Sequence, residues 1–164
     1  MESDFILLAG IPGTGKTFYG EHLETVHGYH HIETDRGEVG LAQNVWSEIL
    51  PPSSVYVSSL MQRYGNVVLE WSFKVDFVPP VLGLGCQGAR LVWFFADLDL
   101  ARRAFARAKR DDQNEMKAFD IQVQQIRNAH LPTKEFLQVE TLTRRRPLSP
   151  SEVDAVVGPR GECQ

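Results

Sequence analysis

The sequence has few cysteines and no long apolar segment. Among its 164 residues there are two cysteines, Cys86 and Cys163, which lie far apart and in no metal-ligand or redox spacing. Such usage is typical of reduced thiols in a cytosolic protein. No apolar run approaches the length of a membrane span, and no basic region precedes the first hydrophobic stretch. We therefore expect a cytoplasmic protein that is neither secreted nor inserted in a membrane.

The sequence also lacks an excess of positive charge. The formal net charge is -4, which argues against broad, non-specific binding to nucleic acid but leaves room for a local basic groove. Hydrophobic residues make up 43% of the chain and charged residues 23%, as in ordinary globular proteins. The length predicts one domain over residues 1–158, followed by a frayed tail over residues 159–164.

What stands out is a glycine-rich turn near the start of the chain. The apolar run Phe5–Ala9 leads into a segment that fits the phosphate-loop pattern G-x-x-x-x-G-K-[ST], which chance would produce in about 0.5% of chains this long. Glycines let successive backbone N–H groups point into one concavity, where the dipole of the following helix adds positive potential. The expected nucleotide-binding residues are Gly10, Pro12, Gly13, Thr14, Gly15, Lys16 and Thr17. Lys16 is expected to reach the β- and γ-phosphates, and the Thr17 hydroxyl to bind Mg²⁺.

The rest of the chain alternates between apolar strand signals and helical spacing. Strands are predicted over residues 5–9, 30–34, 66–71, 90–96 and 136–139. Helices are predicted over residues 17–27, 41–50, 56–64, 97–110 and 115–129, with a weaker signal over 78–86. Ser149 and Glu152 form a capping box that predicts a last helix over residues 152–157. The alternation predicts an α/β fold with a parallel sheet covered by helices on both faces.

Two acids stand at the ends of predicted strands. In such sheets ligands bind outside the carboxyl ends of the strands, so Asp35 and Glu70 should share one rim with the phosphate loop. Glu70 is a candidate to hold Mg²⁺ directly or through water, and Asp35 to accept the proton of a substrate hydroxyl. The alternatives are a solvent-facing carboxylate at Glu70 and a turn or surface ion pair at Asp35.

Arginines gather on one face of the helix that follows the fourth predicted strand. Arg103, Arg107 and Arg110 fall at i, i+4 and i+7. This face is either solvated or able to close over the γ-phosphate, where an arginine stabilises transition-state charge. Arg107 and Arg110 are our candidates for that role. The run over residues 144–146 fits a solvated turn or a contact to an anionic partner.

The five histidines give no catalytic signal. His22, His27 and His130 show no partner pattern in the sequence. His30 and His31 precede the end of the second predicted strand, which favours structural roles.

The motifs taken together resemble the small P-loop kinases. The residues that carry the resemblance are Gly10 to Thr17, Asp35, the strand with Glu70, and the arginine-bearing helix after Asp97. The chain is similar to AAA-family, zeta-toxin-like and polynucleotide-kinase-like ATP-binding proteins, and to the shikimate- and gluconate-kinase-like fold. The resemblance implies a three-layer α/β/α P-loop NTPase fold with strand order 2-3-1-4-5 and a short lid. It also implies that Asp35 activates the acceptor hydroxyl and that Arg110 serves the γ-phosphate.

Two departures from the pattern of the small P-loop kinases bear on activity. Relatives commonly carry Asp-x-Gly-Phe where this chain has Glu70-Trp71-Ser72-Phe73, and Arg-Asn where it has Arg110-Asp111. The longer Glu70 side chain can still reach a metal through water.

The leading functional hypothesis is an ATP- and Mg²⁺-dependent kinase. It would move the γ-phosphate of ATP to a hydroxyl of a small molecule or of a nucleic-acid end. The alternative is a regulatory or toxin–antitoxin-type module that binds ATP and turns it over slowly, with ATP hydrolysis as the remaining activity. A GTPase ranks low because no Asn-Lys-x-Asp segment precedes the fifth predicted strand. The sequence names neither the acceptor nor the oligomeric state.

Overall fold

The structure, a computed structural model, describes residues 3–34, 55–110, 112–131, 133–144 and 146–159. Three of the sequence predictions lie wholly or mostly outside these ranges. They are the helix expected over residues 41–50, the position of Asp35 and the tail expected over residues 159–164.

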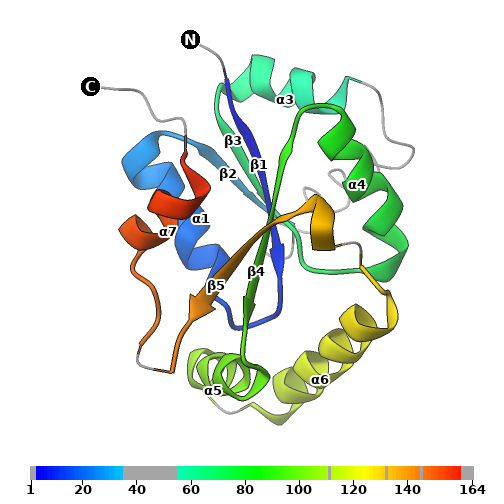
Figure 1. Cartoon of the computed structure of the whole chain (residues 1–164), viewed down its shortest axis with the longest axis vertical. Coiled ribbons are helices and arrows are strands. Elements are labelled where there is room, and N and C mark those ends of the chain that lie inside the picture. The colour runs from blue at the N-terminus through cyan, green and yellow to red at the C-terminus, as the bar shows by residue number, and fades with distance from the viewer. Residues whose placement is uncertain (1–2, 35–54, 111, 132, 145, 160–164) are drawn as a thin grey trace.

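Five strands form one parallel sheet in the order β2-β3-β1-β4-β5. This confirms the strand order that the resemblance implied. The strands are β1 (Phe5–Gly10), β2 (His30–Glu33), β3 (Val67–Glu70), β4 (Arg90–Ala96) and β5 (Leu137–Leu142). Because all of the strands run the same way, their carboxyl ends meet at one edge of the sheet, as Figure 1 shows.

Helices cover both faces of the sheet and its carboxyl edge. The described helices are α1 (Lys16–His27), α3 (Tyr56–Tyr64), α4 (Val78–Cys86), α5 (Leu98–Ala108), α6 (Gln113–Asn128) and α7 (Pro150–Val157). In Figure 1, α1 and α7 lie on one side of the sheet, α3 and α4 on the other, and α5 and α6 beyond the carboxyl ends of the strands. Among the described helices, none is long and apolar enough to cross a membrane.

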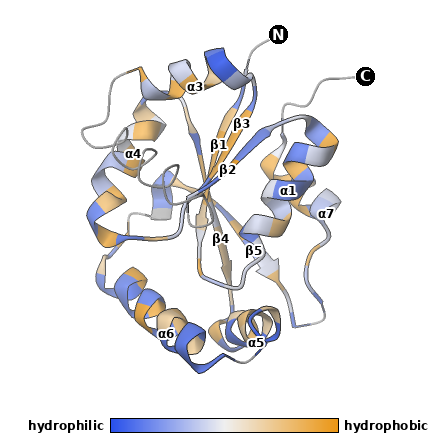
Figure 2. Ribbon diagram, turned by 180° about the vertical axis from the view of Figure 1, so that it is seen from behind, coloured by the Kyte–Doolittle hydropathy of each residue, from blue (hydrophilic) through white to orange (hydrophobic). Residues whose placement is uncertain are grey.

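Alternation along β1 explains how the sheet holds two helical layers. Ile6 and Leu8 join the core under α1 and α7, whereas Leu7 and Ala9 join the core under α3 and α4. Successive side chains of a strand point to opposite faces, so a strand buried on both faces is apolar throughout. Figure 2 shows apolar residues along the central strands and a mixture of apolar and polar residues on the helices around them.

The end of the chain differs in detail from the sequence prediction. The last strand reaches Leu142, beyond the predicted range 136–139, because alternate residues such as Val139 and Thr141 are buried while Glu140 is exposed. The capping box before α7 is confirmed. The Ser149 backbone N–H donates to Glu152 Oε2 at 2.8 Å, and Ser149 Oγ accepts from the Glu152 N–H at 3.4 Å.

Candidate active site

The segment between β1 and α1 turns sharply at three glycines with positive φ. Gly10, Gly13 and Gly15 have φ values of 146°, 80° and 85°. A Cβ atom at Gly10 would collide with the backbone carbonyl of Phe94, and one at Gly13 with the carbonyl of Ala101. A Cβ atom at Gly15 would meet nothing within 4 Å. The loop therefore needs glycine both for its backbone angles and, at two positions, for its close approach to neighbouring backbone.

Neighbouring strands hold the loop in shape. The Ile11 N–H donates to the Phe94 carbonyl of β4 at 3.0 Å, and the Thr14 hydroxyl donates to the Ile11 carbonyl at 2.6 Å. From β5, the buried Thr141 hydroxyl donates to the Thr14 carbonyl at 2.8 Å. Sequence reasoning missed Thr141, because nothing near it in the sequence points to a residue 127 positions earlier.

The loop opens onto the amino end of α1. Gly15 precedes the helix, no side chain caps its first turn, and no acidic residue lies there. Lys16 is buried, and its ammonium donates to the carbonyls of Gly10 and Ile11, both at 3.2 Å. Uncapped helix amides, a helix dipole and an ammonium group together make a site for an anion.

A side-chain contact joins the loop to the carboxyl end of β3. The Thr17 hydroxyl donates to Glu70 Oε1 at 2.9 Å. The other carboxylate oxygen, Oε2, is buried without a hydrogen bond and lies 3.4 Å from Nε2 of His31. Burial alone would raise the pKa of Glu70, but His31, the Lys16 charge and the Thr17 hydroxyl together hold that pKa below its usual range. Glu70 is therefore an ionised carboxylate beside the phosphate loop.

The residues around Glu70 fit a magnesium ion. Thr17 and Glu70 offer a hydroxyl and a carboxylate oxygen, which are the hard ligands that Mg²⁺ prefers. One carboxylate oxygen is buried without a hydrogen-bond donor, as expected of a group that has a further ligand to bind. Ligand atoms of His31 and Glu33 lie within 4.8 Å of each other and of the Glu70 carboxylate. His31 and Glu33 were not predicted as site residues, although both lie on β2, next to β3.

A cavity of about 810 Å³ lies over the loop at the carboxyl edge of the sheet. On the side of β2 and β3 its lining is polar, with Glu33, Glu70 and Ser72. On the side of β4 and β5 its lining is largely apolar, with Phe105, Leu142, Pro147, Leu148 and Val153. Phe18, in the first turn of α1, also lines the cavity and is 62% exposed. The exposure of this aromatic ring was not predicted from the sequence.

The arginines of α5 do not line this cavity in the described part of the chain. Arg107 and Arg110 are exposed, and Arg110 lies just beyond the end of the helix with φ of 53°. The cation that α5 and its end bring to the cavity is Lys109, whose ammonium lies 3.7 Å from Glu115 of α6. Lys109 was not predicted as a site residue, because that prediction rested on the spacing of the arginines, and Lys109 lies just beyond the end of α5.

Comparison with known proteins gives matches in structure alone. No protein-family model and no curated protein sequence matches the chain. Solved structures do match. A shikimate kinase from Bacteroides thetaiotaomicron is 15% identical with a TM-score of 0.61, over 95% of this chain and 99% of that one. A gluconokinase from Sinorhizobium meliloti 1021 is 16% identical with a TM-score of 0.60, over 95% of this chain and 91% of that one.

A third match extends the same result. The tunicamycin resistance protein of Deinococcus radiodurans is 19% identical with a TM-score of 0.60, and the match covers 96% of each chain. This chain has the P-loop kinase fold. Within the P-loop kinase fold, the loop at Gly10–Thr17 lies where β1 passes into α1, and β3 and β4 flank β1 on its two sides.

Proposed function

We propose that this protein is an ATP-dependent kinase. It transfers the γ-phosphate of ATP to a hydroxyl group of a small molecule or of a nucleic-acid end. The observation that carries the proposal is the contact of 2.9 Å between Thr17 and Glu70, which brings an ionised carboxylate to the phosphate loop. Phosphoryl transfer needs positioning and charge neutralisation more than covalent chemistry, and these residues supply both.

Lys16 and the loop amides bind the phosphates in this proposal. The Lys16 ammonium now satisfies two loop carbonyls at 3.2 Å, so it is already held over the loop before ATP arrives. Preorganised donors of this kind stabilise developing charge without reorganising during the reaction. The uncapped first turn of α1 adds backbone N–H groups for the same anion.

Thr17 and Glu70 would hold the magnesium ion. The ion would supply positive charge to offset the negative charge that develops on the phosphates. Within the protein, the Thr17 hydrogen bond fixes one Glu70 oxygen, and the His31 ring lies 3.4 Å from the other. These contacts hold the carboxylate in place and shield it from bulk water.

The two halves of the cavity suggest where each substrate binds. A purine base is flat and largely apolar, so we place it on the β4–β5 side, near Phe105 and Leu148. A hydroxyl-rich acceptor needs hydrogen-bond partners, so we place it on the β2–β3 side, near Glu33 and Ser72. Asp35 follows two residues after Glu33, and we propose that it accepts the proton of the attacking hydroxyl.

Arg107 and Arg110 are proposed to stabilise charge on the transferred phosphoryl group. Both side chains are exposed, so this role requires α5 to close over the loop when substrates bind. Lys109, which already lines the cavity, would reinforce them. Arg110→Ala should then lower kcat with little change in the Kd of ATP, because its contact forms only on closure.

A transfer assay with labelled ATP tests the proposal. The protein is incubated with Mg²⁺ and a panel of acceptors, namely sugar acids, shikimate-like hydroxy acids, nucleosides, oligonucleotides and antibiotics. Hydroxy acids lead the panel because solved structures with this fold include kinases of that class. Transfer should be lost in Lys16→Ala and in Asp35→Asn. It should persist in Lys117→Ala, an exposed lysine of α6 that does not line the cavity.

The same assay separates the alternatives. Binding of ATP without transfer to any acceptor would favour the alternative, a regulatory or toxin–antitoxin-type module that turns ATP over slowly. A larger melting shift with GTP than with ATP would overturn the choice of nucleotide. Transfer that persists in Lys16→Ala would overturn the site itself.

A further inference from the structure

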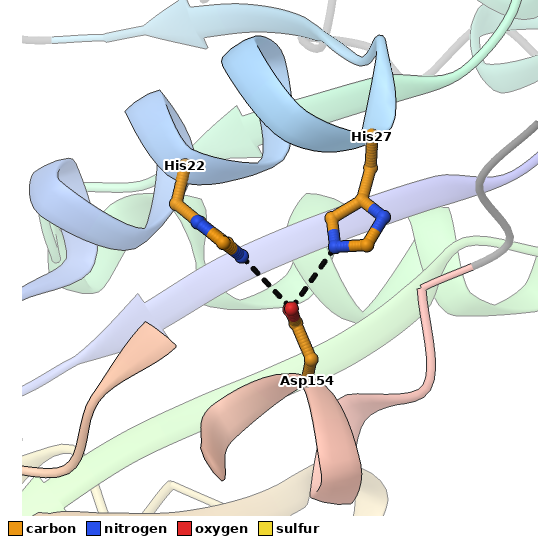
Figure 3. A group of neighbouring side chains, drawn as sticks. All are labelled: His22, His27 and Asp154. Carbon is orange, nitrogen blue, oxygen red and sulfur yellow. Dashed lines mark hydrogen bonds and ion pairs between the residues drawn. The ribbon is translucent and has the colours of Figure 1, made fainter. Parts of the chain in front are cut away.

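Three side chains meet between α1 and α7, away from the phosphate loop. His22 and His27 come from α1, and Asp154 comes from α7. The Nε2 atoms of the two rings lie 2.8 Å and 3.0 Å from the same carboxylate oxygen, Asp154 Oδ2. Figure 3 shows both rings directed at that oxygen from the side of α1. The proposed kinase reaction uses none of these residues.

We propose that His22, His27 and Asp154 form a binding site for a transition-metal ion, most suitably Zn²⁺. The bound ion would join α1 to α7. Two imidazole nitrogens and one carboxylate are a ligand set that suits Zn²⁺, and they leave a fourth position for water. Imidazole ligands disfavour Mg²⁺ and Ca²⁺, which take oxygen ligands. The site differs from the one at Glu70, where one imidazole accompanies two carboxylates.

The distances suit such an ion with little rearrangement. All three ligand atoms lie within 4.8 Å of one another. Zinc holds nitrogen and oxygen ligands at about 2.0–2.2 Å, which places neighbouring ligand atoms of a tetrahedral site about 3.3 Å apart. The two contacts to Asp154 at 2.8 Å and 3.0 Å need to lengthen only slightly. Without the ion, Nε2 of each ring donates to Asp154. When the ion binds, the proton of each neutral ring moves to Nδ1, a change of tautomer that frees Nε2 without a change of charge.

Surrounding contacts fix the ligands before any ion arrives. The Tyr19 hydroxyl donates to the second carboxylate oxygen, Asp154 Oδ1, at 2.8 Å, and the Tyr19 ring stacks on His22 at 5.9 Å. Outer hydrogen bonds of this kind orient metal ligands in known sites. The three ligand side chains remain 15–23% exposed, so an ion can enter from solvent. All of them stand on helices that pack on the same sheet, which keeps the geometry rigid.

Metal titration of the purified protein tests this site. The protein is stripped with a chelator and returned to buffer with excess Mg²⁺, so that the oxygen ligands near the loop are occupied. Zinc is then titrated against a chromophoric competitor. We expect one Zn²⁺ per chain. His22→Gln and His27→Gln should each weaken binding by about 100-fold or more, because even the outer partners of a metal site are worth about 10–100-fold.

Two further variants locate the ion. Tyr19→Phe removes an outer contact and should weaken binding by about 10–100-fold. His30→Gln is the matched control, since His30 stacks on Tyr64 outside the cluster, and it should bind Zn²⁺ as the parent does. Loss of binding in Glu70→Gln with full binding in His22→Gln would place the ion at the phosphate loop and overturn the proposal. So would the absence of stoichiometric binding.

Two readouts on the parent protein do not depend on how the variants fold. Zinc at about 100 times its Kd should raise the melting temperature by about 5–10 °C, because the ion binds the folded state and links two helices. Cobalt in place of zinc should give the strong visible absorption of a four-coordinate site with nitrogen and oxygen ligands. Weak absorption typical of an octahedral ion would contradict the assignment. Either result applies with or without kinase activity, so failure of this site is distinguishable from failure of the proposed function.

Discussion

Two carboxylates from other elements contact α1, and their surroundings differ. Glu70 belongs to β3 and Asp154 to α7. Glu70 lies at the amino end of α1, where Oε1 accepts from Thr17 and Oε2 is buried without a hydrogen bond. Asp154 lies farther along the helix, and both of its oxygens accept hydrogen bonds from α1 side chains. A carboxylate with a buried oxygen that accepts no hydrogen bond suits the magnesium site that we propose. A carboxylate held from three sides is placed to join two helices.

Both carboxyls have a lowered pKa, but different neighbouring groups lower it. Burial would raise the pKa of each carboxyl, but neighbouring groups outweigh it and hold both pKa values below their usual range. At Glu70 the opposing groups include the Lys16 ammonium, whereas at Asp154 they are His22, His27 and Tyr19. The Glu70 cluster is thus tied to the charge of the phosphate loop, and the Asp154 cluster is independent of it.

Among the changes that test this comparison, Glu70→Gln has the largest expected effect. The change keeps the size of the side chain but removes the charge that would hold Mg²⁺, so phosphoryl transfer should fall by about 100-fold or more. The measurement is kcat/KM with an accepted substrate. Glu24→Gln, at an exposed position of α1, is the control and should leave the rate near that of the parent. Equal rates for the two variants would remove the distinction between the clusters.

Thr17→Val should have the next largest effect. Valine keeps the shape of the side chain but cannot donate to Glu70. The factor by which Mg²⁺ tightens ATP binding should therefore fall by about 10–100-fold. The Kd of ATP with and without Mg²⁺ measures this. Thr25→Val is the matched control, because its hydroxyl donates to the Glu21 carbonyl within α1. If both variants kept the full magnesium dependence, Thr17 would not bind the ion.

Asp154→Ala tests the structural cluster. It leaves two histidines and a tyrosine hydroxyl without their acceptor, so the free energy of unfolding should fall by about 2 kcal/mol in the presence of chelator. Denaturant titration measures it. Asp120→Ala breaks an exposed ion pair with Arg102 and should cost less than about 1 kcal/mol. A loss at Asp154 no larger than at Asp120 would mean that the cluster does not stabilise the fold.

The smallest effect is expected at the start of α7, the helix that carries Asp154. Ser149→Ala removes the acceptor that caps the helix and should lower the free energy of unfolding by about 1 kcal/mol. Ser151→Ala, at an exposed position in the first turn, should change it little. Similar values for the two serines would show that the capping box contributes nothing measurable.

The sequence predicted most of what depends on neighbouring residues. The apolar run before Gly10, the glycines of the loop and the capping box at Ser149 each act within a few positions, so their signals are local. The order of the strands came from the resemblance and is confirmed. The roles of Lys16, Thr17 and Glu70 stay predictions, although the structure brings the three residues together.

What the sequence did not predict depends on contacts between distant segments. His22 and His27 are five positions apart, which places them about 140° from each other around a helix and hides their common partner. That partner, Asp154, lies more than 120 residues later. The contact of Thr141 with the loop spans a similar separation. The spacing of the arginines in α5 predicted a charged face. It did not predict that Lys109 would line the cavity.

Calorimetric titration with ATP in the presence of Mg²⁺ tests the central claim most directly. We expect Lys16→Ala to bind ATP about 10–100-fold more weakly than the parent, because it loses a charge-assisted contact to the phosphates. Lys117→Ala should bind as the parent does. Equal affinity of Lys16→Ala and the parent would contradict the account, since the loop at Gly10–Thr17 would then not bind the triphosphate.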